Sequence, residues 1–263
     1  YPAILTDEVV GEQATSLFAD TQKMLNQIVS EKWLTAKGIL GIFPANTIND
    51  DDIELITDNR QPTTFLTLRQ QSQKTAGAPN IALADFIAPK DAGKQDYIGC
   101  FCVTTGFGVD EKAAEFEKQL DDYNAILVKA LGDRFAEAFA EYLHLKVRKE
   151  IWGYASDEQL SNQELIKENY KGIRPAPGYP ACPDHTEKVT LFQLLDAANH
   201  TGVSLTESLA MTPASSVSGW YFGHPESKYF DLGKITNEQV IDLAKRKSKS
   251  KEVMARWLSS VMV

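Results

Sequence analysis

Cysteine is scarce in this chain and has none of the spacings that metal or disulfide chemistry requires. There are only three, Cys100, Cys102 and Cys182, with no CxxC pair among them. Cys100 and Cys102 lie two apart in a run of strand-forming residues, so both thiols point to one face, where they are poor disulfide partners. The four histidines are scattered. The sequence therefore predicts buried or loop thiols, a reducing cytoplasm and no metal site.

Positive charge is also in short supply. The chain has 27 lysines and arginines against 36 acidic residues, for a net charge of −9. Proteins that bind nucleic acid or an anionic membrane surface usually carry a basic excess or patch. The only basic run, Lys245–Lys251, is typical of a solvated helix end, and no apolar run is long enough to span a membrane. We therefore expect neither nucleic acid nor membrane as a partner, and a cytoplasmic location.

The glycine loops that bind nucleotide phosphates are missing. Residues 104–111 follow a predicted strand and open a predicted helix, with Gly106 and Gly108 in place, but Glu111 stands where the third glycine of a dinucleotide fingerprint belongs. A carboxylate at that helix start would repel a pyrophosphate. Nucleophile elbow, P-loop and HExxH motifs are absent as well. These absences exclude the common nucleotide-dependent and hydrolytic sites.

The hydrophobic patterns predict helices and strands that do not alternate strictly. Helices are expected over 7–32 and 110–149, the second with a break or kink at Gly132, and strands over 38–43, 52–57, 63–68 and 97–105, with a turn at 58–62. The 263 residues allow one large domain or two small ones. We expect an α+β fold with a mainly antiparallel sheet, and not a Rossmann fold.

Three segments have capping-box spacing, in which a Ser or Thr precedes a Glu or Gln by three residues. They begin at Ser161, Thr190 and Thr236 and predict short helices over 161–170, 190–200 and 236–247. Gly202 is well placed to end the second helix. Residues 205–211 and 217–222 are expected to form a strand pair around Pro213.

Proline is concentrated in one segment, Arg174–Pro183, which holds four prolines in ten residues. Such a segment must be a stiff, extended loop, because proline fixes φ and lacks an N–H. Some of its backbone groups should remain available to a ligand, Gly178 permits close approach, and the Arg174 guanidinium suits a carboxylate. Composition alone slightly favours a plain connector between two elements.

A second segment, residues 217–230, is dense in aromatic side chains. We expect Trp220 and Phe222 to fill the core, and Tyr229 and Phe230, which follow a His-Pro pair, to lie at the surface or in a cleft. Together with Arg174, these rings would suit a ligand that bears a carboxylate and a planar base.

Long motifs along the chain carry a family resemblance. They are Leu83–Pro89, Asp96–Gly99, Asp121–Asn124, Ala136–His144, Arg174–Lys188, Glu207–Met211, Val217–Phe222 and Ser227–Phe230. Nearly the whole chain resembles the C-terminal activation domain of cobalamin-dependent methionine synthase. On this basis residues 1–263 are expected to be one activation domain, and a fragment of a longer multidomain chain.

The resemblance implies a single C-shaped domain with a bent sheet and flanking helices. It implies binding of S-adenosylmethionine and reductive methylation of cob(II)alamin, which reactivates an enzyme that makes methionine from homocysteine and methyltetrahydrofolate. The implied partners are the cobalamin-binding domain of the same polypeptide and flavodoxin or an equivalent reductase. The isolated domain would not turn over, and no residue of it would be catalytic, since reduced cobalt is the nucleophile.

The resemblance also implies the roles of individual residues. Arg174 would hold the carboxylate of S-adenosylmethionine, and the backbone around Ala176 and Gly178 would meet its adenine end. Tyr179 would lie toward the cobalamin.

The remaining implied residues come from the helices and from the aromatic segment. Tyr229 and Phe230 would complete the pocket, and Glu137 and Glu168 would lie near the sulfonium. The alternatives are a docking module for the cobalamin domain and flavodoxin that binds no ligand, and a hydrolase built on Asp/Glu pairs.

Overall fold

A five-stranded antiparallel sheet forms the centre of the computed structural model, which describes residues 2–57 and 62–263. The strands lie in the order β3-β2-β1-β4-β7, and every neighbouring pair is antiparallel. Their bounds are β1 (Thr35–Ile48), β2 (Asp52–Ile56), β3 (Pro62–Leu66), β4 (Asp96–Phe107) and β7 (Ser216–Tyr221). The expected antiparallel α+β fold is confirmed, and the expected turn at 58–62 lies mostly outside the described residues.

Helices and a small hairpin surround this sheet. The helices are α1 (Gly11–Glu31), α2 (Val109–Lys118), α3 (Asp122–Lys146), α4 (Asn162–Ile166), α5 (Glu187–Leu195), α6 (Ala197–Thr201), α7 (Asn237–Arg246) and α8 (Lys251–Trp257). The hairpin pairs β5 (Ser204–Leu205) with β6 (Met211–Thr212). Short helical turns are η1 (Ala3–Thr6), η2 (Leu83–Phe86), η3 (Lys90–Ala92) and the π-helical η4 (Val147–Ile151).

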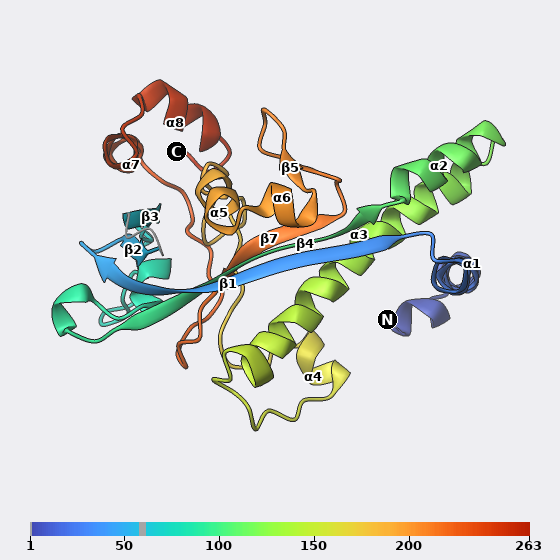
Figure 1. Ribbon diagram of the computed structural model, residues 1–263, viewed down its shortest axis with the longest axis horizontal. Coiled ribbons are helices and arrows are strands. Elements are labelled where there is room, and N and C mark those ends of the chain that lie inside the picture. Colours follow the sequence, from blue (N-terminus) through green and yellow to red (C-terminus); the bar gives the residue numbers. More distant parts are fainter. Residues whose placement is uncertain (1, 58–61) are drawn as a thin grey trace.

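Strand β4 is buried on both faces because helices cover both sides of the sheet (Figure 1). Cys100 and Cys102 face a core cluster that includes Leu191 of α5. Phe101 and Val103 point the other way, into a cluster with α3. The period of two that placed both thiols on one face is confirmed, and all three cysteines are free and buried.

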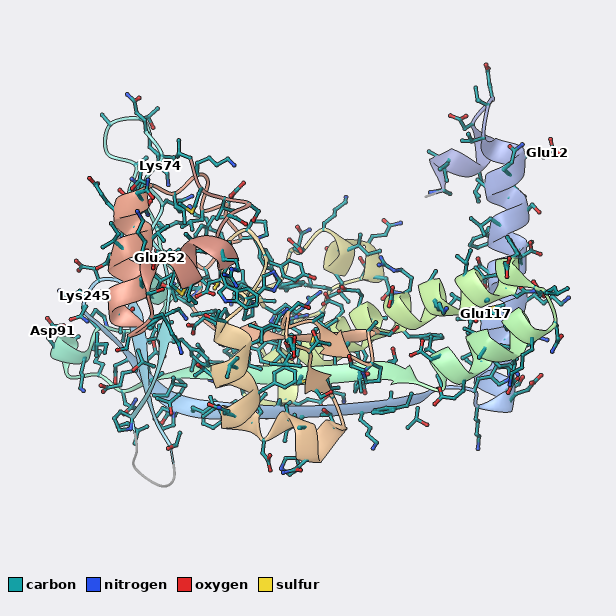
Figure 2. All side chains as sticks on the ribbon, turned by 90° about the horizontal axis from the view of Figure 1, so that it is seen from above. Glu12, Lys74, Asp91, Glu117, Lys245 and Glu252 are labelled. Carbon is teal, nitrogen blue, oxygen red and sulfur yellow. The ribbon has the colours of Figure 1, made fainter. Side chains whose placement is uncertain are left out.

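The outline of the molecule is a C. Figure 2 shows α1, near Glu12, rising from one end of the sheet. At the other end the C-terminal helices, near Lys245 and Glu252, and the loop that carries Lys74 rise on the same side. The long strands β1 and β4 run between these two ends (Figure 1). This shape agrees with the expected C-shaped domain.

The C-terminal helices form a small core of their own. Val240, Leu243 and Met254 are buried together with Leu68, which follows β3. The expected capping box at Thr236 is present and starts α7, and the one at Ser161 starts α4. Both short helices therefore begin where their sequence predicts.

The basic run Lys245–Lys251 is only partly solvated, in contrast to its prediction. Arg246 pairs with the buried Asp52, and Lys247 pairs with two buried acids, Asp184 and Glu187. These pairs attach α7 to the sheet and to α5. Charge pairing with distant acids cannot be read from a local run of lysines, which is why the interpretation was wrong for these two residues.

The long helix expected over 110–149 breaks at a different place. Leu120 has φ +60°, and Asp121 caps α3 by accepting a hydrogen bond from the Asn124 amide at 3.0 Å. Gly132 lies inside an unbroken α3, where an added Cβ would come within 2.8 Å of Ser215. Close packing, rather than a kink, accounts for this glycine.

Two further predictions were wrong in detail. Thr190 is inside α5, which begins at Glu187, directly after Thr186, whose N–H donates to Asp184 Oδ1 at 2.8 Å, whereas Gly202 does end α6 as expected. Residues 216–221 pair with β4 instead of with 205–211. This partner is more than a hundred residues away in the sequence, so local pattern could not reveal it.

Candidate functional site

The proline-rich loop lies alongside the exposed edge of β7. Ile173 exchanges backbone hydrogen bonds of 3.1 and 3.0 Å with Phe222, and the Pro175 carbonyl accepts from the Trp220 amide at 2.9 Å. Gly219 makes this approach possible, since a Cβ there would lie 2.5 Å from the Pro175 oxygen. Proline has no backbone N–H, and it is tolerated here because a segment at the edge of a sheet does not need every N–H for strand pairing.

Beyond Pro175 the loop closes into a tight turn. The Gly178 amide donates to the Cys182 carbonyl at 2.7 Å, and the Cys182 amide donates to the Tyr179 carbonyl at 2.9 Å. Gly178 has φ +95°, and a Cβ there would come within 2.3 Å of the His185 ring. The loop is therefore held by hydrogen bonds and by packing as well as by its prolines, and fewer of its backbone groups remain open than the sequence predicts.

This loop forms one wall of a pocket of about 540 Å³, which we call the Arg174 pocket. Its lining residues are Glu137, Glu168, Arg174, Pro175, Ala176, Tyr179, Pro180, Ala181, Val217, Tyr229, Phe230 and Asp231. They come from α3, from the segment after α4, from the loop, from β7 and from the segment that follows it. Five stretches that are distant in sequence thus converge on one site.

Seven of the eight residues expected at a ligand site line this pocket together. The exception is Gly178, which is not among the lining residues and whose amide is already used within the turn. Trp220 and Phe222 are buried in the core, and Tyr229 is partly exposed, as expected. The ligand contacts of all eight residues stay predictions.

Arg174 is fixed on one side and open on the other. Its Nη1 donates to Glu141 Oε2 at 2.5 Å and to the Tyr170 hydroxyl at 3.1 Å, and its backbone N–H donates to the Tyr229 hydroxyl at 3.0 Å. In the described part of the chain, Nε and Nη2 have no hydrogen-bond partner. Burial alone would lower the pKa of Arg174, but Tyr170 and Glu141 raise it, so the group is a permanent cation.

A second arginine shows what a fully occupied guanidinium looks like. Arg69 borders a larger hollow of about 810 Å³ near η2 and η3. Its five N–H groups reach Asp50, Asp51, Asn80 and both oxygens of Asp85. No donor of Arg69 is left for a ligand, so the smaller Arg174 pocket is the better candidate for anion recognition.

Acidic and aromatic side chains line the rest of the Arg174 pocket together with proline, alanine and valine. Glu137, Glu168 and Asp231 bring three carboxylates, and Glu168 sits in the left-handed region with φ +56° where α4 has ended. Tyr179 is 55% exposed at the rim, and burial together with Glu137 raises the pKa of its hydroxyl. The site can therefore bind one carboxylate, at Arg174, and one or more positive charges.

Sequence reasoning missed some residues that shape the site. Glu141 and Tyr170 hold Arg174, and Asp231 adds a third acid to the lining. A signal for Glu141 was present, because it lies four residues after Glu137 and so on the same face of a helix. No local pattern marks Tyr170 or Asp231.

Two other features are absent from the described residues, a metal-binding cluster and a membrane-spanning helix. Within residues 2–57 and 62–263, no group of three or more His, Cys, Asp or Glu side chains is arranged to hold a metal ion. In the same residues no helix is both long and apolar enough to cross a membrane.

Comparison with known proteins agrees with this geometry. A family model described as "Vitamin B12 dependent methionine synthase, activation domain" matches residues 1–248. A solved structure of the MetH reactivation domain bound to AdoHcy is 56% identical, with a TM-score of 0.94, and the match covers 100% of this chain and 81% of that one. The chain therefore belongs to the family of activation domains of vitamin B12-dependent methionine synthase.

Proposed function

We propose that this chain binds S-adenosylmethionine in the Arg174 pocket and presents its methyl group for the reductive methylation of cob(II)alamin. The observation that carries the proposal is the Nε–Nη2 edge of Arg174, which has no hydrogen-bond partner among the described residues, in a pocket that also contains three acids and three aromatic rings. A similar domain, 56% identical, has been solved with AdoHcy, the demethylated form of this ligand.

The chemical groups of the ligand match the groups that line the pocket. A guanidinium edge suits the ligand carboxylate through two charge-assisted hydrogen bonds. Glu137, Glu168 and Asp231 suit its ammonium and sulfonium charges, and Tyr229 and Phe230 offer rings to its adenine. AdoHcy lacks the sulfonium charge, so the acidic lining favours the methylated form.

The chain contributes position and surroundings rather than acid or base chemistry. When bound, cobalamin supplies the reduced cobalt that accepts the methyl group. Arg174 and the rigid loop fix one end of the donor, and Tyr179, exposed at the rim, is the residue that would meet the corrin. We propose that cobalamin is held mainly by another domain of the same polypeptide and that this domain alone does not turn over.

The electron donor is proposed to be flavodoxin or an equivalent reductase. Of the basic run near the C-terminus, Arg246 and Lys247 are engaged in internal ion pairs, whereas Lys245, Lys249 and Lys251 are exposed. These three lysines are the part of the run that can meet an acidic partner. Charge reversal at the three positions should slow reduction at low salt and matter less at high salt.

Calorimetric titration with S-adenosylmethionine tests the proposed binding. We expect the chain to bind, and Arg174→Ala to bind roughly tenfold or more weakly, because a hydrogen bond to a charged group is lost. Arg256→Ala is the matched control, since Arg256 is exposed on α8 and is not among the lining residues. Equal melting temperatures with and without millimolar ligand would instead support a docking module that binds no ligand.

A further inference from the structure

Next to the Arg174 pocket lies a row of buried and partly buried charges that alternate in sign. Arg174 Nη1 is 2.5 Å from Glu141 Oε2, Glu141 Oε1 is 3.8 Å from Arg148 Nη1, and Arg148 Nε is 2.9 Å from Glu158 Oε2. The side chain of Arg148 is 0% exposed and that of Glu158 is 7% exposed. Only the Arg174 end of the row borders the pocket.

Arg148 is the fixed point of this row. It lies in η4, the π-helical turn that follows α3, a feature often found beside functional sites. Its Nε and Nη2 both donate to Glu158, and its Cζ lies 4.2 Å from the centre of the Tyr170 ring. Arg148 thereby holds Tyr170, which is the second acceptor for Arg174 Nη1.

Glu141 joins this fixed arginine to the one in the pocket. Arg148 Nη1 and Glu141 Oε1 are both buried, and neither has a hydrogen-bond partner among the described residues. They face each other at 3.8 Å, so attraction between the charges is what connects them. The other oxygen of Glu141 is used by Arg174, and one carboxylate therefore serves both cations.

The two contacts at Nη1 decide which edge of Arg174 a ligand can use. Both N–H groups of Nη1 are taken, one by Glu141 and one by Tyr170. The guanidinium is planar, so fixing Nη1 fixes the direction of the Nε–Nη2 edge. A ligand carboxylate must then bind side-on, at that edge.

We infer that Glu141 is a positioning residue, which orients Arg174 for side-on recognition of the ligand carboxylate and prevents Arg174 and Arg148 from repelling each other. The inference rests on the proposed function, because it concerns the same ligand. Glu141 is not among the lining residues of the pocket, so it acts on the ligand through Arg174.

A pair of ligands separates this role from a general loss of structure. S-adenosylmethionine carries the carboxylate, and decarboxylated S-adenosylmethionine keeps the adenosine, sulfonium and ammonium groups but lacks it. The 263-residue chain and its Glu141→Gln variant are titrated with each ligand by calorimetry. Glutamine keeps the shape of the side chain but removes its charge.

We expect Glu141→Gln to weaken S-adenosylmethionine roughly tenfold and to leave the decarboxylated ligand within about twofold of its original affinity. In an Arg174→Ala background, Glu141→Gln should cause no further loss, because the residue through which it acts is gone. Glu150→Gln is the matched control, since Glu150 is exposed and pairs only with Lys146 among the described residues.

Each other outcome decides against one of the two statements. An equal loss for both ligands, or no loss for either, overturns the positioning role of Glu141 while the proposed function stands. Further weakening by Glu141→Gln in the Arg174→Ala background also overturns it. Absence of S-adenosylmethionine binding by the parent chain, whose folding is checked by its thermal transition, refutes the proposed function and with it the inference.

Discussion

Two groups of buried or partly buried charges lie at different places in this domain, and they differ in how completely they are paired. At the C-terminal end Lys247 reaches three acceptors, on Asp184, Thr186 and Glu187. Beside the pocket, Arg174 leaves three of its five N–H groups without a partner in the described residues. The first group fastens one part of the fold to another, and the second keeps hydrogen-bonding capacity for a ligand.

From this difference we expect mutations in the first group to change stability and mutations in the second group to change ligand binding. A buried charge whose partners are all internal costs stability when a partner is removed. A buried charge with an open edge has a further function for which only the ligand is the partner. Each prediction below perturbs one of the two groups.

The largest effect is expected at Lys247. Replacement by Met leaves Asp184 and Glu187 buried without a cation, which should lower the free energy of unfolding by about 3–5 kcal/mol. Chemical denaturation measures the change. Lys245→Met is the control, because Lys245 is exposed two positions earlier, and a similar loss in both variants would show that the ion pair is not the cause.

We expect the titration of Glu187 to make the stability of the domain depend on pH. Burial raises the pKa of this carboxyl to about 7, against the opposing effect of Lys247. The folded protein thus binds the proton more tightly than the unfolded chain, and this contribution to stability is lost as pH rises from the unfolded pKa of about 4.5 through 7.

Comparison of the parent chain with Glu187→Gln isolates the contribution of Glu187 to the pH dependence of stability. The stability of the parent relative to the variant should fall between pH 4.5 and 7 by on the order of 3 kcal/mol, measured by urea denaturation across that range. A difference that stays constant with pH would mean that Glu187 is ionised throughout.

At the pocket, Arg174→Lys should separate binding from stability. Lysine keeps the charge beside Glu141 but has no planar fork, so we expect the affinity for S-adenosylmethionine to fall by about 1.5–3 kcal/mol. Stability should change by less than about 1 kcal/mol. Calorimetry measures the affinity, and denaturation measures the free energy of unfolding. A loss of stability as large as that of Lys247→Met would contradict the proposed difference between the two groups of charges.

The smallest effect is expected at Tyr229. Its hydroxyl accepts the hydrogen bond of the Arg174 backbone N–H at 3.0 Å. Tyr229→Phe should therefore cost about 0.5–1.5 kcal/mol of unfolding free energy, read from denaturation curves. Tyr97→Phe, at an exposed tyrosine near the start of β4, should cost less, and the reverse order would contradict the assigned contact.

Local sequence was enough to predict the proline-rich loop and the aromatic residues of the site, but not the strand pairing and the buried charges that hold them in place. Four prolines around Gly178 leave little choice but a stiff loop, and caps at Ser161 and Thr236 mark helix starts. The pairing of β7 with β4 and the burial of Arg148 depend on contacts between separate segments. The spacing of hydrophobic residues along the chain does not report such contacts.

The same limit explains the candidate site. Arg174 could be proposed because guanidinium chemistry belongs to the residue itself. Its orientation depends on Glu141, 33 positions earlier in the chain, and on Arg148 behind it. An arginine in a helical pattern is ordinarily predicted to be solvated, so nothing in the sequence marked Arg148 as an anchor.

The burial of the three thiols has a consequence for a protein that handles an electrophile. Thiolate, not thiol, attacks a methyl sulfonium or an oxidant. Burial raises the pKa of Cys102 to about 12 and those of Cys100 and Cys182 well above their usual range. Burial therefore favours the thiol over the thiolate at all three positions, which lowers their reactivity toward a methyl sulfonium and toward oxidants.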